Sequence, residues 1–230
     1  MTTIGVVERV CLQGSVRRVL AMKGKWGEFF RVNKDIFLRT LCLVAVNFFF
    51  TSSGGKQGPM ILAVNTLLMT LFTLFSYIMD GFAYAGEALS GKYYGAGDRV
   101  GLCITVRRLF GFGIIMALFF TLMYVFGGVG FLHLLTSDRT VVVAAHPYLF
   151  WAYLIPVVGM AAFVLDGVFI GLTATKGLFS TAMAMITFFV VYYLLWSSYG
   201  NDALWIAFLS FLGMRGIASI LWARRYLVIF

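Results

Sequence analysis

Residues 59–93 read PMILAVNTLLMTLFTLFSYIMDGFAYAGEALSGKY, and this stretch decides the class of fold. It is apolar along almost its whole length and exceeds the roughly 20 residues that a helix needs to cross a bilayer. It lacks the alternating pattern, in runs of about ten residues, that marks the strands of a membrane β-barrel. The stretch therefore predicts a transmembrane α-helix that tilts, kinks or protrudes from the membrane because it is long.

Similar apolar runs recur along the chain. Only 12% of the 230 residues are charged and 61% are hydrophobic, whereas a soluble domain carries about 25% charged residues. The composition excludes a soluble fold, and the expected fold is an all-α bundle of six transmembrane helices. Pro156 predicts a kink, because proline removes a backbone donor inside the fourth span. The six predicted spans are Ile36–Ser53, Pro59–Tyr93, Arg99–Phe126, Val141–Thr173, Gly177–Ser197 and Ala203–Trp222.

The positive charges predict the orientation of these spans. The net charge is +9, which in a membrane protein is more typical of basic cytoplasmic loops than of nucleic-acid binding. With the N-terminus inside, the outer loops hold only Lys56 and Arg139. We therefore expect a protein of the inner (plasma) membrane with both termini cytoplasmic and no nucleic-acid partner. The basic residues on the cytoplasmic side are then Arg9, Arg17, Arg18, Lys23, Lys25, Arg31, Lys34, Lys92, Arg99, Arg107, Arg108, Lys176, Arg224 and Arg225.

Residues 1–34 are basic and differ in composition from residues 35–230, the predicted transmembrane domain. No apolar run follows Met1, so no secretory signal peptide is predicted. We expect a basic segment on the cytoplasmic face, where anionic lipid attracts it. A mitochondrial transit peptide is the alternative interpretation of the same composition.

Residues suited to catalysis are few. The three cysteines are widely spaced, and His133 and His146 lie near the predicted outer surface, away from the acidic groups. We therefore expect no metal site, no acid–base constellation and no enzyme activity. Residues 91–98, GKYYGAGD, lack the Gly-Lys-Ser/Thr ending of a phosphate loop, so no nucleotide cofactor is expected. They predict a tight turn with Asp98 capping the next helix.

A polar stripe runs along one face of residues 59–93. Its members recur at steps of three and four, which places them on one side of a helix. A charged side chain at the bilayer centre costs about 2.5–3.5 kcal/mol, so we expect the stripe around Asp80 to line a water-filled cavity. For Glu87, nearer the interface, packing against neighbouring helices explains the polarity equally well. The stripe consists of Asn65, Met69, Phe72, Ser76, Asp80, Tyr84 and Glu87.

Asp166 is a further ionisable residue inside a predicted span. It follows Pro156 by about three helical turns. A helix broken at Pro156 would free backbone carbonyls near this carboxylate, an arrangement suited to a proton or Na⁺. An ion pair with Arg215 of the last span is the alternative, and the two are compatible. Arg39 is expected to pair with Asp35, one turn earlier on its own helix.

Several short motifs resemble one known family. Residues 80–88, DGFAYAGEA, and 90–98, SGKYYGAGD, closely resemble a signature of the MATE (multidrug and toxic compound extrusion) exporters, in their DinF-like branch. Other stretches agree with it, so the resemblance covers nearly the whole chain. They are FRVNKDI (30–36), AVN (63–65), IPVVG (155–159) leading into LDG (165–167), ALW (203–205) and RG (215–216).

The resemblance implies that the chain is one lobe of a larger fold. Family members have two six-helix lobes, and this chain resembles the second, helices 7–12, with residues 1–34 similar to the linker between lobes. Asp166 matches the region of helix 10 where some relatives hold a cation-binding aspartate. Their partner acid on helix 7 has no counterpart, because Arg39 and Asn47 are the polar groups there. The acid that couples protons in the DinF-like branch lies on the first lobe.

The resemblance implies the C-terminal half of a secondary efflux transporter that exports amphipathic organic compounds in exchange for H⁺ or Na⁺. Such a lobe would work in the lipid bilayer with an N-terminal-lobe partner or as a homodimer. The alternatives are a non-transporting membrane interaction subunit, an inert truncated remnant, and a lipid or oligosaccharide flippase. The expected cavity and coupling residues are Asp80, Asp166, Glu87, Arg215, Tyr84, Asn65 and Asn47, with Asp166 as the candidate Na⁺ ligand.

Overall fold

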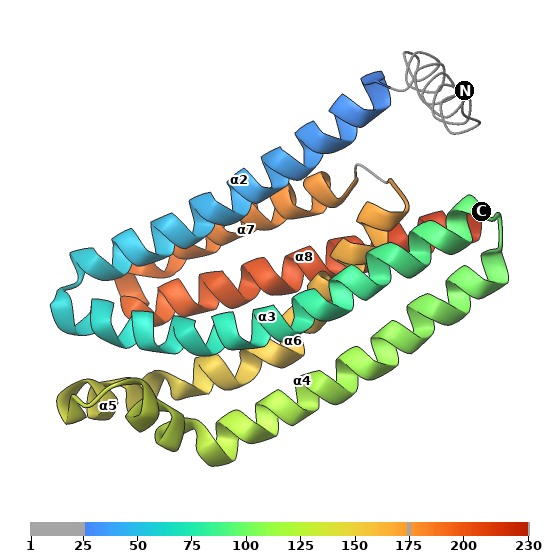
Figure 1. The fold of residues 1–230 in the computed structure, drawn as a ribbon. Helices are drawn as coiled ribbons and strands as arrows, with labels where there is room; N and C mark the ends of the chain where they lie inside the picture. The colour runs from blue at the N-terminus through green and yellow to red at the C-terminus, as the bar shows by residue number, and fades with distance from the viewer. Residues whose placement is uncertain (1–25, 174–175, 230) are drawn as a thin grey trace, which may run out of the picture.

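The computed structural model of the chain describes residues 26–173 and 176–229, and within them the protein is a bundle of long helices (Figure 1). Six of the described segments are long and apolar enough to cross a membrane, which confirms the predicted all-α membrane fold. With the labels of Figure 1, the elements are α2 (Trp26–Lys56), α3 (Pro59–Gly95), α4 (Arg99–Leu135), α5 (Arg139–Ala145), the 3₁₀ helix η2 (His146–Tyr148), α6 (Leu149–Gly171), α7 (Lys176–Tyr199) and α8 (Asn201–Ile229).

Two helix boundaries differ most from the predicted spans, by nine or ten residues. α4 continues beyond Phe126 to Leu135, although the glycines that follow Phe126 suggest an end. Inside a bilayer the backbone finds hydrogen-bond partners only within a helix, so the helix persists through them. α2 begins at Trp26, so its first turns precede the predicted start of the transmembrane domain at residue 35. The basic residues between positions 9 and 25 lie outside the described residues.

The turn between α3 and α4 has the predicted geometry. Gly97 adopts φ +68°, a conformation that a side chain would strain. Asp98 caps α4, because its carboxylate Oδ1 accepts a hydrogen bond from the backbone N–H of Gly101 at 2.9 Å. These two residues reverse the chain within a few positions and set α4 beside α3.

α6 continues as one helix through Pro156, and the kink expected there stays a prediction. The hydroxyl of Thr121 on α4 donates to the carbonyl of Tyr153 in the turn before the proline, at 3.3 Å. Hydroxyl groups of neighbouring helices commonly satisfy carbonyls near a membrane proline. The α-helical conformation of the fourth span changes before Pro156, at the 3₁₀ helix η2 between α5 and α6. Pro147 lies in the first turn of η2, where the N–H that proline lacks would have no hydrogen-bond partner within the helix.

Two glycines let α6 cross α3 at backbone contact. A Cβ added at Gly167 would overlap the carbonyl of Ala83, and one at Gly171 would overlap the carbonyl of Glu87. Ser90 on α3 lies at the crossing, where its hydroxyl oxygen is 3.3 Å from the carbonyl oxygen of Val168 and 2.5 Å from that of Gly86 in its own helix. Small residues at a crossing are the usual means of close helix packing in membranes. The crossing brings the polar face of α3 against α6.

α6 and α8 form the interior of the bundle (Figure 1). In their most apolar stretches 67% and 61% of the residues are buried, against 33% or less in the other four candidate spans. Fully buried aromatic side chains of α8, such as Trp205 and Phe208, pack edge-on or tilted against Phe50 of α2. The remaining helices surround this pair.

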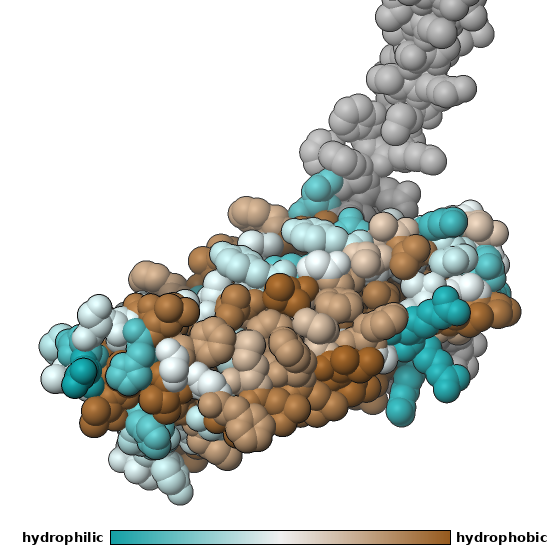
Figure 2. Space-filling model, turned by 60° about the horizontal axis from the view of Figure 1, so that its bottom comes forward, coloured by the Kyte–Doolittle hydropathy of each residue, from teal (hydrophilic) through white to brown (hydrophobic). Residues whose placement is uncertain are grey.

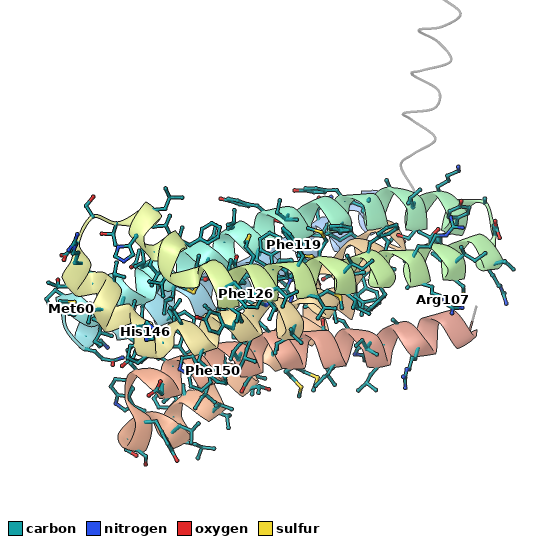
Figure 3. The ribbon with its side chains drawn as sticks, turned by 90° about the horizontal axis from the view of Figure 1, so that it is seen from below. Met60, Arg107, Phe119, Phe126, His146 and Phe150 are labelled. Atoms are coloured by element: carbon teal, nitrogen blue, oxygen red, sulfur yellow. The ribbon has the colours of Figure 1, made fainter. Side chains whose placement is uncertain are left out.

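The face drawn in Figure 2 carries an apolar band across its middle, with polar side chains gathered at both ends. α4 contributes strongly exposed aromatic residues to the surface, including Phe119 and Phe126 (Figure 3). A soluble monomer rarely exposes such a surface, whereas lipid tails solvate it. The chain is therefore a multi-pass membrane protein.

The two ends of the bundle differ in charge. Arg107 lies at the end where the described chain begins and finishes, opposite to Met60 and His146 (Figures 1 and 3). Lys92, Arg99 and Arg224 belong to helix ends on the side of Arg107, whereas Lys56 and Arg139 lie at the other end. The asymmetry that the sequence predicts thus corresponds to the two faces of one bundle.

Candidate substrate and ion cavity

A cavity of about 360 Å³ opens within the transmembrane part of the bundle, between α2, α3, α6 and α8. Its wall combines five charged side chains with aromatic and small residues. The lining residues are Arg39, Leu43 and Asn47 of α2, Phe72, Ser76, Asp80, Ala83, Tyr84 and Glu87 of α3, Phe163, Asp166, Gly167 and Ile170 of α6, and Arg215 of α8.

The polar stripe of α3 forms one wall of this cavity from Phe72 to Glu87. Asp80 and Glu87 are partly buried, while Tyr84 is 71% exposed. The helical spacing of these residues places them on one face of α3. Asn47 of α2 also lines the cavity, and its amide donates to the carbonyl of Leu43 in the preceding turn at 2.9 Å.

Asn65 lies elsewhere, which corrects its prediction as a cavity residue. It is buried and exchanges two hydrogen bonds with the amide of Asn201, at 2.8 and 3.0 Å. The indole N–H of Trp205 donates to the same Asn65 oxygen at 3.0 Å. The cluster satisfies these amide groups inside the bundle, where unpaired polar atoms are costly. Helical periodicity cannot reveal it, because the partners come from α8.

Asp166 and Arg215 form a buried ion pair between α6 and α8. Both side chains are about 5% exposed. The Arg215 guanidinium also lies over the ring of Phe163, 5.3 Å from its centroid, in a cation–π arrangement. This is one of the two arrangements that the sequence suggests for Asp166.

Arg39 approaches Asp166 rather than Asp35, which corrects the predicted i, i+4 pair. Its Nη1 lies 3.4 Å from Oδ1 of Asp166, and among the described residues no ion pair joins it to Asp35. Asp166 is shielded from water, so its attraction for a guanidinium is stronger than that of a more exposed carboxylate. The sequence misses this contact because Arg39 and Asp166 belong to different helices.

The charges of the cavity are unequally matched. Both arginines contact Asp166, and among the described residues no ion pair reaches Asp80 or Glu87. Two guanidinium groups beside Asp166 repel a further cation, so this carboxylate is poorly suited to the Na⁺ predicted for it. Asp80 and Glu87 are therefore the cavity carboxylates without an ion pair among the described residues.

Three buried polar atoms at the ion pair lack a hydrogen-bond partner among the described residues: Nε of Arg39, Nε of Arg215 and Oδ1 of Asp166. Buried polar atoms normally have a partner in the protein or in ordered water. Within the described part of the chain, no group of three or more histidine, cysteine and acidic residues could hold a metal ion.

Comparison with known proteins supplies the family. The MatE family model matches residues 36–196. The chain is 36% identical over 224 residues to DNA damage-inducible protein F of Escherichia coli K12, covering 92% of this chain and 49% of that protein. It is 24% identical over 214 residues to Protein DETOXIFICATION 42 of Arabidopsis thaliana, covering 86% and 39%. The chain spans about half the length or less of these relatives, and it belongs to the MATE family as a DinF-like protein.

Proposed function

We propose that this chain is the C-terminal half, helices 7–12, of a MATE-type secondary transporter of the inner membrane. It exports amphipathic organic compounds in exchange for H⁺ or Na⁺. Family membership and coverage of about half of the relative from Escherichia coli support this assignment. Residues 1–34 then form the linker to the first lobe, and residues 35–230 form the six-helix lobe.

The observation that carries the proposal is the cavity with its surplus of carboxylates. Asp80, Glu87 and Asp166 face Arg39 and Arg215, so the fully ionised cavity has a formal charge of one negative. A negative site inside a membrane protein costs free energy until a cation or proton neutralises it. One cation at a time satisfies that charge, so a coupling ion and a cationic substrate compete, as exchange requires.

Within this lobe, Asp80 is the residue to which we assign ion coupling, beside the acid expected on the first lobe. It lies on the cavity wall without an ion pair among the described residues, whereas Asp166 is already held by Arg39 and Arg215. A proton or Na⁺ bound at Asp80 removes the charge that attracts a cationic substrate. Glu87, on the same face of α3 two turns away, is a second site for the same ion on its path to the cavity end.

The aromatic residues of the cavity suit an amphipathic substrate. Phe72, Phe163 and Tyr84 line it beside the carboxylates. Aromatic faces attract organic cations and also offer apolar contact. A flat or cationic compound can thus stack on these rings while its charge approaches Asp80.

A second lobe completes the transport cycle. Alternating access moves one lobe against another around a site near the bilayer midplane. Tyr84 is 71% exposed although it lines the cavity, so the cavity reaches the surface of the bundle on the face that a second lobe would cover. We assign this place to an N-terminal lobe or, in its absence, to a second copy of the chain.

The test is efflux of a fluorescent cationic dye from cells that produce the chain together with an N-terminal lobe. Asp80→Asn, which removes one charge and keeps the side-chain volume, should reduce the efflux rate at least about tenfold. Asp35→Asn is the matched control, because Asp35 does not line the cavity, and it should retain the wild-type rate. Wild-type efflux from Asp80→Asn would exclude a coupling role for this carboxylate.

A further inference from the structure

A second cavity, of about 610 Å³, lies at the end of the bundle opposite to Arg107. It forms where α4 ends and α5 and η2 begin, and it shares no lining residue with the first cavity. The residues that line it are Val129 and His133 of α4, Arg139, Val142 and Val143 of α5, and His146 and Pro147 of η2.

Three basic side chains that can donate hydrogen bonds line this cavity. Arg139, His133 and His146 are all exposed, so a ligand can reach them. An arginine offers five N–H donors, and an imidazole offers at least one donor in either charge state. No carboxylate is among the lining residues that the structure describes. The lining therefore offers hydrogen-bond donors and one formal positive charge to an anion.

The carboxylate of Asp138, the residue before Arg139, caps α5. Asp138 precedes Arg139 but does not line the cavity. Its Oδ1 accepts hydrogen bonds from the backbone N–H and the hydroxyl of Thr140, at 2.9 and 2.6 Å, and so caps α5. These hydrogen bonds hold the pKa of Asp138 below its ordinary value, and the bond from the Thr140 hydroxyl has the larger effect. The Asp138 carboxylate is therefore hydrogen-bonded within the cap of α5 and is not among the groups that line the cavity.

The rest of the cavity is apolar and adjoins the lipid-facing surface. Val129, Val142 and Pro147 line it together with the basic groups. Phe126 and Phe150 are 86% and 57% exposed, and Figure 3 places both between His146 and the middle of the bundle. The cavity therefore stands at the end of the bundle that holds His146 (Figure 3). In a bilayer this is the depth of the lipid headgroups.

We propose that this cavity binds a phosphate group. A carboxylate has two oxygens in one plane, whereas a phosphate presents three or more acceptor oxygens to donors that come from α4, α5 and η2. Arginine is well suited to phosphate, because its donors match two oxygens at once. The phosphate of a lipid headgroup and free phosphate share this chemistry. The proposal does not depend on the transport function.

Binding is measured on the purified full chain in phospholipid-free detergent, by titration calorimetry. Three probes separate the sources of the phosphate: water-soluble dihexanoyl phosphatidylglycerol, inorganic phosphate, and dihexanoylglycerol, which keeps the acyl chains and lacks phosphate. Arg139→Gln should weaken binding of the phosphate-bearing probe at least about tenfold, because a charge-assisted hydrogen bond is lost. The double variant His133→Gln/His146→Gln should weaken it to a similar degree.

Lys56→Gln is the matched control. It removes one positive charge from the same end of the bundle, and Lys56 is exposed and does not line the cavity. Its affinity should stay within about twofold of wild type, because long-range attraction between exposed charges is largely screened by salt. A second measurement needs no variant: on the wild-type chain, the phospholipid should bind at least tenfold more tightly than dihexanoylglycerol.

Each outcome of these measurements either supports the proposed phosphate site or overturns it. Binding of the phospholipid without inorganic phosphate identifies a headgroup site in which the acyl chains contact the apolar residues, and similar affinity for both identifies a site for free phosphate. The proposal is overturned if neither phosphate-bearing probe binds, if dihexanoylglycerol binds as tightly as the phospholipid, or if Lys56→Gln and Arg139→Gln weaken binding equally.

Discussion

Nη1 of Arg39 lies 3.4 Å from Oδ1 of Asp166, so α2 and α6 are linked by charge across the wall of the membrane cavity. The other carboxylate oxygen of Asp166 is taken by Arg215 of α8. One carboxylate thus joins three helices of the bundle. Its environment differs from that of Asp80, which faces the same cavity without an ion pair among the described residues.

Arg215→Ala should destabilise the bundle more than Arg39→Ala. Arg215 is buried and hydrogen-bonded to Asp166, whereas Arg39 is 17% exposed and makes the longer contact. Removing one partner of a buried ion pair costs about 3–5 kcal/mol, and the residual pair with Arg39 offsets part of that. The measurement is thermal unfolding in lipid nanodiscs, and equal melting temperatures of the two variants would contradict the inequality.

Substitutions of the three acidic residues of the cavity should differ in their effects on dye efflux and on melting temperature. Asp80→Asn and Asp166→Asn should both impair dye efflux more than Glu87→Gln, because Glu87 lies nearer the membrane interface. Asp80→Asn should leave the melting temperature unchanged, since no described ion pair is lost. Asp166→Asn should lower it, because two buried guanidinium groups lose their counter-charge. Efflux and melting measured on the same preparations distinguish coupling from stability.

Asn65→Ala should lower the free energy of unfolding by about 1–3 kcal/mol, because Asn201 and the Trp205 indole lose their buried partner. Asn47→Ala removes the same side chain, but the amide of Asn47 bonds only within its own helix among the described residues. Its cost should stay below about 1 kcal/mol. Chemical unfolding in detergent compares the two, and the order of their effects is the result that matters.

Gly167→Ala should force α3 and α6 apart. The added methyl group would meet the carbonyl of Ala83, which cannot rotate away because it belongs to the backbone. Overpacking of this kind costs about 1–3 kcal/mol. Gly111→Ala on the exposed face of α4 meets no atom within 4 Å, and it should be neutral or stabilise the helix by up to about 1 kcal/mol. A Gly167→Ala chain as stable as wild type would show that the crossing tolerates displacement.

Reporter fusions should reveal the orientation of the bundle. Fusions after Gln57 and Ser137 should report the outer side, and fusions after Gly97 and Thr173 the cytoplasm. The reason is that the basic residues gather at the end of the second pair. These positions lie in the turns between the helices, so the reporter interrupts no span. A reversed result at any of them would contradict two cytoplasmic termini.

The six membrane spans and the polar face of α3 were determined by the sequence alone. A helix in lipid must satisfy its own backbone and cover itself with apolar side chains, so each span is marked locally by length and hydropathy. The placing of Asp80 and Glu87 on one face follows from the helical period of a single segment. The capping role of Asp98 is local in the same way.

Only the tertiary structure decided which groups meet across helices. The pairing of Asn65 with Asn201 and the approach of Arg39 to Asp166 join segments more than 100 residues apart. Such contacts depend on which faces pack together, and that choice is made by close backbone crossings such as the one at Gly167. The local pattern around Arg39 favours Asp35, but the lower polarity of the interior makes Asp166 the stronger partner.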